Sequence, residues 1–90
     1  MSNEHPYTIG KVYLVRTATY ATCGRLKAVF PGELVFSDAA WVADTGRFTQ
    51  AVASGTFAEV EPVTTGDIIV SRGGIIDVCE TPAVLPLQQK

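Results

Sequence analysis

Histidine, tryptophan and cysteine are scarce in this sequence, with one, one and two residues among 90. Two cysteines are too few for a disulfide scaffold, which favours a reducing, cytosolic compartment. Cys23 and Cys79 could meet as neighbours on strands, but buried free thiols are the better interpretation. No apolar run reaches the roughly 20 residues that span a bilayer, and residues 1–6 lack the basic and apolar stretches of a secretion signal. We therefore expect a cytoplasmic chain with no membrane partner.

Charge is also scarce, because only 18% of the residues are charged while 47% are hydrophobic. The net charge of −2 argues against a partner that is a DNA or RNA polymer, since such partners require many Lys and Arg residues. A small anionic ligand needs only one or two arginines. A chain of this length buries only roughly 60–65% of its unfolded surface. The remaining apolar surface predicts subunit contacts, and hence a homo-oligomer.

Groups suited to catalysis or metal binding are few. His5 is the only histidine, so there is no convincing Ser–His or Cys–His pair to activate a nucleophile. Asp38 and Asp44 have neither EF-hand nor zinc-site spacing, and helix or turn capping explains them better. The acidic residues of the later strands are typical of a solvated face; they are Glu59, Glu61, Asp77 and Glu80. We expect no enzyme, no metal and no cofactor.

β-branched and alternating runs predict strands along most of the chain. The first two cover residues 11–17 and 20–30, and Gly24 within the second indicates a bulge or a close backbone approach. Shorter strands are predicted at 34–37, 58–61, 68–71 and 75–79. Arg72–Gly74 suits a tight hairpin turn or a bulge. The fold class is mainly β (α+β): one domain over residues 1–90, built as a small curled sheet or barrel of five to six strands with one short helix, after a loose arm at residues 1–8.

The stretch from Asp38 to Gly55 breaks the β pattern and contains the predicted helix. Asp44 or Thr45 would cap its start, and Arg47 would lie in its first turn. Gly55 is expected to end it. The buried face of this helix would consist of Phe48, Ala51 and Val52.

Trp41 and Arg47 form a candidate site for an anionic ligand before and at the start of this helix. A tryptophan offers a flat stacking surface, and an arginine binds phosphate or carboxylate oxygens with paired donors. Free backbone N–H groups near Thr45 would also attract an anion. In the alternative, Trp41 is a core residue and Arg47 a surface charge. The usual burial preferences of these residue types favour this alternative.

The run Asp38–Phe48, DAAWVADTGRF, resembles a signature of small phage-encoded proteins of unknown function. Three further segments resemble the same proteins, and they are Tyr7–Lys11, Glu59–Pro62 and Arg72–Asp77. The sequence departs from the family near residues 81–83, which leaves the role of the tail open. These proteins are similar to the anti-CBASS sponges of phages, which bind cyclic dinucleotides without cleaving them.

This resemblance implies an immune-evasion protein in the cytoplasm of an infected bacterial host. It would sequester a cyclic dinucleotide or a related nucleotide signal as a homo-oligomer. Trp41 or Tyr20 would stack on the bases, and Arg47 and Arg72 would contact the phosphates. The alternative is a structural or protein-interaction module without a small ligand, such as a virion accessory protein or an inhibitor of a host factor. A small hydrolase is the third possibility.

Overall fold

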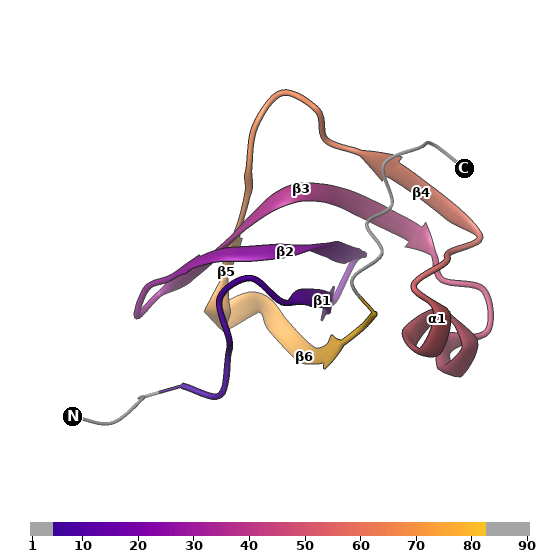
Figure 1. Cartoon of the computed structure of the whole chain (residues 1–90), viewed down its shortest axis with the longest axis horizontal. Helices are drawn as coiled ribbons and strands as arrows, with labels where there is room; N and C mark the ends of the chain where they lie inside the picture. Colours follow the sequence, from indigo (N-terminus) through magenta and orange to yellow (C-terminus); the bar gives the residue numbers. More distant parts are fainter. Residues whose placement is uncertain (1–4, 83–90) are drawn as a thin grey trace.

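The structure is a computed structural model that describes residues 5–82. Its elements are β1 (Val12–Thr17), β2 (Ala21–Val29), β3 (Glu33–Asp44), α1 (Phe48–Ser54), β4 (Glu59–Pro62), β5 (Ile68–Ser71), the 3₁₀ turn η1 (Arg72–Gly74) and β6 (Ile75–Glu80). One six-stranded antiparallel sheet runs in the order β4-β3-β2-β1-β6, and β5 also pairs with β3 (Figure 1). The predicted small curled sheet with one short helix is confirmed, and the sheet is not closed into a barrel.

Strand β3 is the longest strand and has two partners along one side. Its first part, Glu33–Phe36, pairs with β5, and its last part, Ala40–Asp44, pairs with β4. Between them Asp38 adopts a left-handed φ of 48°. The prediction that the strand ends at residue 37 is therefore wrong. Small residues with little β preference continue the strand because β2 and β4 pair with them on both sides.

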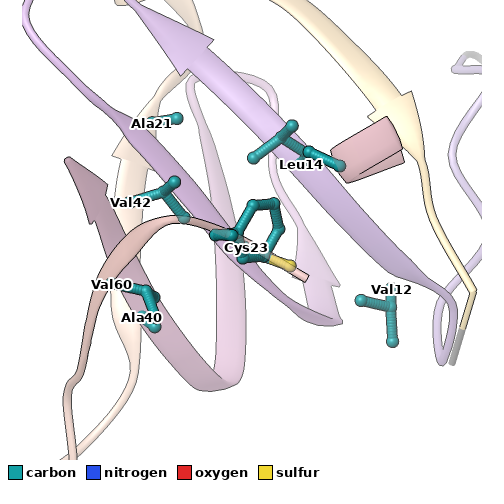
Figure 2. Packing of buried hydrophobic residues seen from close by; sticks show 9 residues of the cluster. Val12, Leu14, Ala21, Cys23, Ala40, Val42 and Val60 are labelled. Atoms are coloured by element: carbon teal, nitrogen blue, oxygen red, sulfur yellow. The ribbon is translucent and has the colours of Figure 1, made fainter. Parts of the chain in front are cut away.

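The sheet has a hydrophobic core on each face, because alternate residues of a strand point in opposite directions. In β1, Val12 and Leu14 join the first core, whereas Tyr13 and Val15 join the second. The first core gathers residues of β1, β2, β3 and β4 (Figure 2), and Ala51 of α1 belongs to it as well. The second includes residues of β5 and β6, which curl over the opposite face. This arrangement explains why four successive residues of β1 are buried.

Gly24 lies where β2 and β3 approach most closely. The β2–β3 register shifts between Cys23 and Arg25. A Cβ atom at position 24 would lie 2.7 Å from the Cβ atom of Ala39 and 3.1 Å from that of Phe36. The close approach expected at Gly24 is confirmed, whereas the extra residue at this register shift lies opposite it in β3, between Ser37 and Ala40.

The start of α1 differs from the prediction. The helix begins at Phe48, and its N-cap residue is Arg47, which makes no side-chain capping bond. The Asp44 carboxylate instead accepts a hydrogen bond from the backbone N–H of Gly46 at 2.8 Å, and the Thr45 hydroxyl donates to the Gly46 carbonyl at 3.0 Å. Asp44 and Thr45 thus stabilise the preceding turn, and the helix starts two or three residues later than predicted.

The end and the buried face of α1 match the prediction. Gly55 has a left-handed φ of 75°, and its N–H donates to the carbonyl of Ala51 at 2.8 Å. Ala51 is buried in the first core, and Phe48 and Val52 pack against that core. The helix is therefore held on the sheet by the face expected from its sequence.

Arg72–Gly74 does not form a hairpin turn. It is a 3₁₀ turn that carries the chain from β5, which pairs with β3, to β6, which pairs with β1. The predicted hairpin is therefore wrong, since the two flanking strands do not pair with each other. Tyr7, in the segment predicted as a loose arm, packs against the second core, and Arg72 lies over its ring at 5.7 Å. Residues 1–4 of that segment lie outside the described residues.

Candidate functional site

Two exposed aromatic rings meet at one end of the sheet. Tyr20 directly precedes β2, and Trp41 lies on β3 opposite Thr22. Their ring centroids are 6.0 Å apart at an interplanar angle of 73°. Tyr20 is 46% exposed and Trp41 49%. Trp41 is therefore not a core residue, and it lies on a strand rather than on the irregular segment that the sequence predicts.

A shallow hollow of about 290 Å³ lies beside this pair. The turn between β1 and β2 forms one wall, and the end of β3 with the following turn forms the other. Tyr20 and Thr45 both line it, and its charged lining residues are Arg16 and Asp44. The hollow can accept a flat or extended group from outside, but its open form does not exclude water.

Arg16 is the residue of this region that the sequence reasoning missed. It binds the Asp77 carboxylate with two donors, one of them Nε at 2.8 Å, and its guanidinium lies 4.3 Å from the ring centroid of Phe48. The hydrogen bond from Arg16 lowers the pKa of Asp77, and the same bond raises the pKa of Arg16. A prediction that β1 pairs with β6 would have revealed this ion pair, because Arg16 and Asp77 are direct cross-strand partners.

The two arginines proposed as phosphate ligands lie in different places. Arg47 is exposed and makes no side-chain hydrogen bond or ion pair within residues 5–82. Arg72 lies at the opposite end of β3, where it donates to the carbonyl of Phe30 at 2.8 Å and so holds the β2–β3 turn. The structure therefore gathers Tyr20, Trp41 and Thr45 at one end of the sheet and leaves Arg72 outside that group.

Carboxylates without an ion pair lie near the aromatic pair, at Glu61 and Asp44. Residues 5–82 contain eight carboxylate side chains, and three of them form ion pairs, with Lys11, Arg16 and Lys27. The other five all lie on β3 and β4; they are Glu33, Asp38, Asp44, Glu59 and Glu61. Glu61 is the direct cross-strand partner of Trp41. The local charge is thus acidic, which is unfavourable for a phosphate.

The cysteines are free and separated. Cys23 and Cys79 pair with Leu14 from its two sides, so β1 lies between them. Burial raises the pKa of the Cys23 thiol to about 11. Within the described part of the chain, no three His, Cys, Asp or Glu side chains gather as a metal site. No helix in residues 5–82 is long and apolar enough to cross a membrane.

Comparisons of the chain with protein-family models, curated proteins and solved structures found no match. The resemblance of the Asp38–Phe48 run to phage proteins stays a prediction. The aromatic pair and its surroundings are therefore the features that bear on function.

Proposed function

We propose that this chain is a non-catalytic protein-binding module that docks a partner on the surface formed by Tyr20, Trp41, Thr45 and Glu61, the Tyr20–Trp41 surface. The observation that carries this proposal is the contact between two aromatic side chains that are each about half exposed. Tyrosine and tryptophan are enriched at the centres of protein interfaces, where they contribute much of the binding energy. Their large exposed area at one end of the sheet favours capture of a partner over chemistry.

The charge around the rings supports a protein partner over a phosphate ligand. Glu61 lies beside Trp41, Asp44 lines the hollow, and Asp77 already engages Arg16. A phosphate brought to this position would be repelled by the carboxylates. Among residues 5–82, Arg47 at the start of α1 is the one Lys or Arg side chain without a hydrogen-bond or ion-pair partner.

A random peptide library displayed against the purified protein tests the proposal. We expect selected peptides to change the fluorescence of Trp41, the only tryptophan in the chain, and to remain uncleaved by mass spectrometry. Trp41→Leu should weaken their binding at least tenfold. Phe30→Leu is the matched control, because Phe30 is equally exposed, at 49%, at the other end of β3. Equal binding to wild type and Trp41→Leu would rule out the Tyr20–Trp41 surface.

Sequestration of a nucleotide is a second candidate function. It is supported by the two rings, on which bases stack well, by Thr45, which lines the hollow, and by the exposed Arg47. In the form implied by the family resemblance, a phage protein would hold a cyclic dinucleotide without cleaving it. Native mass spectrometry with cyclic dinucleotides tests this. Arg47→Ala should then lower affinity about ten- to a hundredfold, the effect of one charge-assisted hydrogen bond, with no change in melting temperature.

Both candidate functions include a homo-oligomer. Ile69 and Ile76 are 67% and 66% exposed on β5 and β6, and large exposed apolar side chains commonly mark subunit contacts. We expect light scattering at micromolar concentration to give a multiple of the 9.6 kDa chain mass. A mass of one chain under these conditions would remove oligomerisation from the proposal.

A further inference from the structure

We infer, resting on the proposed function, that the group docked on the Tyr20–Trp41 surface is cationic: an arginine or lysine side chain of the partner protein, held between the Trp41 ring and the Glu61 carboxylate. The partner of this surface would therefore carry a positive charge on an arginine or lysine side chain.

The register of β3 and β4 places the two groups together. Trp41 and Glu61 are direct partners in an antiparallel pair, so their side chains leave the same face of the sheet with Cβ atoms about 4.5–5.5 Å apart. Both side chains are exposed. A cation over an indole ring is attracted by the ring's electrons within about 6 Å, and a carboxylate at this spacing can bind the same cation. Aromatic and acidic groups therefore converge on one ligand position.

Within residues 5–82, no Lys or Arg side chain pairs with the Glu61 carboxylate, the exposed Arg47 included. Lys11, Arg16 and Lys27 are each bound to a carboxylate elsewhere, and Arg72 holds the turn at the other end of β3. The Asp44 carboxylate accepts a hydrogen bond from a backbone N–H, whereas within residues 5–82 the carboxylates of Glu59 and Glu61 have no hydrogen-bond or ion-pair partner. An external cation would complete this cluster without breaking any ion pair of the fold.

The partner class follows from these two features together. A metal ion prefers several converging oxygen ligands, and no such group of three is present in the described residues. A phosphate would face carboxylates of its own sign. A guanidinium or ammonium on a flexible stem satisfies both the indole and the carboxylate, and its apolar stem can also cover the exposed rings.

Two peptides that differ only in charge test the inference. One alternates glycine and arginine, and the other carries citrulline, a neutral analogue of similar shape, at each arginine position. Titration is followed by the fluorescence of Trp41, with calorimetry for variants that lack it. We expect the arginine peptide to bind at least fivefold more tightly than the citrulline peptide, and the difference to shrink as salt is added.

Matched variants locate the cation. Glu61→Gln should weaken binding of the arginine peptide about two- to fivefold, the range for an exposed ion pair, and Trp41→Leu should weaken it by a similar factor. Glu33→Gln is the control, since Glu33 is another exposed and unpaired carboxylate of β3, at the far end of that strand. Its affinity should equal that of the wild type. All three positions are exposed, and equal melting temperatures would confirm that the fold is intact.

The possible results separate the inference from the proposed function. If the citrulline peptide, or library peptides without Arg or Lys, bind through Trp41 as tightly as the arginine peptide, protein docking stands and the cationic partner is overturned. If a cyclic dinucleotide changes Trp41 fluorescence and no peptide does, both are overturned in favour of nucleotide binding. If neither ligand class binds, the Tyr20–Trp41 surface itself is refuted.

Discussion

Gly24→Ala is expected to destabilise the protein because the added methyl group has no room. The new Cβ would lie 2.7 Å from Ala39 Cβ, 3.0 Å from Ala39 Cα and 3.1 Å from Phe36 Cβ. Each distance is well below the 3.5–4.0 Å optimum for two carbon atoms. Because Ala39 and Phe36 are buried at 1% and 0% exposure, β2 and β3 would have to separate. Overpacking of this kind costs about 1–3 kcal/mol, and contact with backbone places this case at the upper end.

Thermal and urea unfolding monitored by circular dichroism would measure the effect. A loss of about 2–3 kcal/mol should lower the melting temperature by roughly 10–20 °C in a domain of this size. Gly32→Ala is the control, because no atom lies within 4 Å of its Cβ position and its φ is not positive. We expect that variant to stay within about 1 kcal/mol of the wild type.

A double-mutant cycle identifies the cause. Ala39→Gly removes the nearest atom, so Gly24→Ala should cost less in that background than in the wild type. Part of the loss should remain, since Ala39 Cα and Phe36 Cβ are still close. A wild-type melting temperature for Gly24→Ala, or strict additivity with Ala39→Gly, would refute the steric argument.

Three further predictions concern the cysteines, one ion pair and the helix end. In the native protein at pH 8, iodoacetamide should label Cys79 before Cys23, because Cys23 is buried and its thiol pKa is raised to about 11; peptide mass spectrometry would show the order, and faster labelling of Cys23 would contradict it. Arg16 lowers the pKa of Asp77 in the folded state, so this contribution to stability is present above the unfolded pKa of about 3.9 and is lost as pH falls through the folded pKa. The stability difference between wild type and Asp77→Asn should therefore shrink during an acid titration, and a constant difference would argue against the pair. Gly55→Ala should cost about 1–2 kcal/mol in urea unfolding, because alanine is strained at the left-handed φ of 75°; unchanged stability would show that the helix end relaxes.

Local features of the sequence predicted the parts of the fold that depend on local chemistry. Gly24 marked the close approach of β2 and β3, Gly55 marked the end of α1, and the spacing of Phe48 and Val52 predicted the buried helix face. Each signal depends on backbone freedom or side-chain periodicity within one element. Such features can be predicted from the sequence before the partners of that element are known.

The sequence failed where a distant partner decides the local structure. Ala39 and Ala40 have little strand preference, yet they continue β3 because β2 and β4 pair with it and because Gly24 leaves room only for small neighbours. The hairpin predicted at Arg72–Gly74 was wrong for the same reason, since β5 and β6 pair with separate strands.

The candidate site was predicted in part. Tyr20, Trp41 and Thr45 were named from their chemistry, and the structure gathers them at one end of the sheet. The acidic surroundings were not foreseen, because Glu61 reaches Trp41 only through the β3–β4 pairing. Arg16 was missed because its partner on β6 is far away in the sequence.

The position of β6 beside β1 has a consequence for how the chain folds. Lys11, which directly precedes β1, forms an ion pair with Glu80 of β6, 69 residues away, whereas β1 and β2 are joined by a short turn. Closing the longer loop costs about 2–3 kcal/mol more conformational entropy than closing the short one. We therefore expect β1, β2 and β3 to form a meander first and β6 to add last. Until then, one edge of β1 and the apolar side chain of Val15 are uncovered. Aggregation during refolding should begin from this half-assembled sheet.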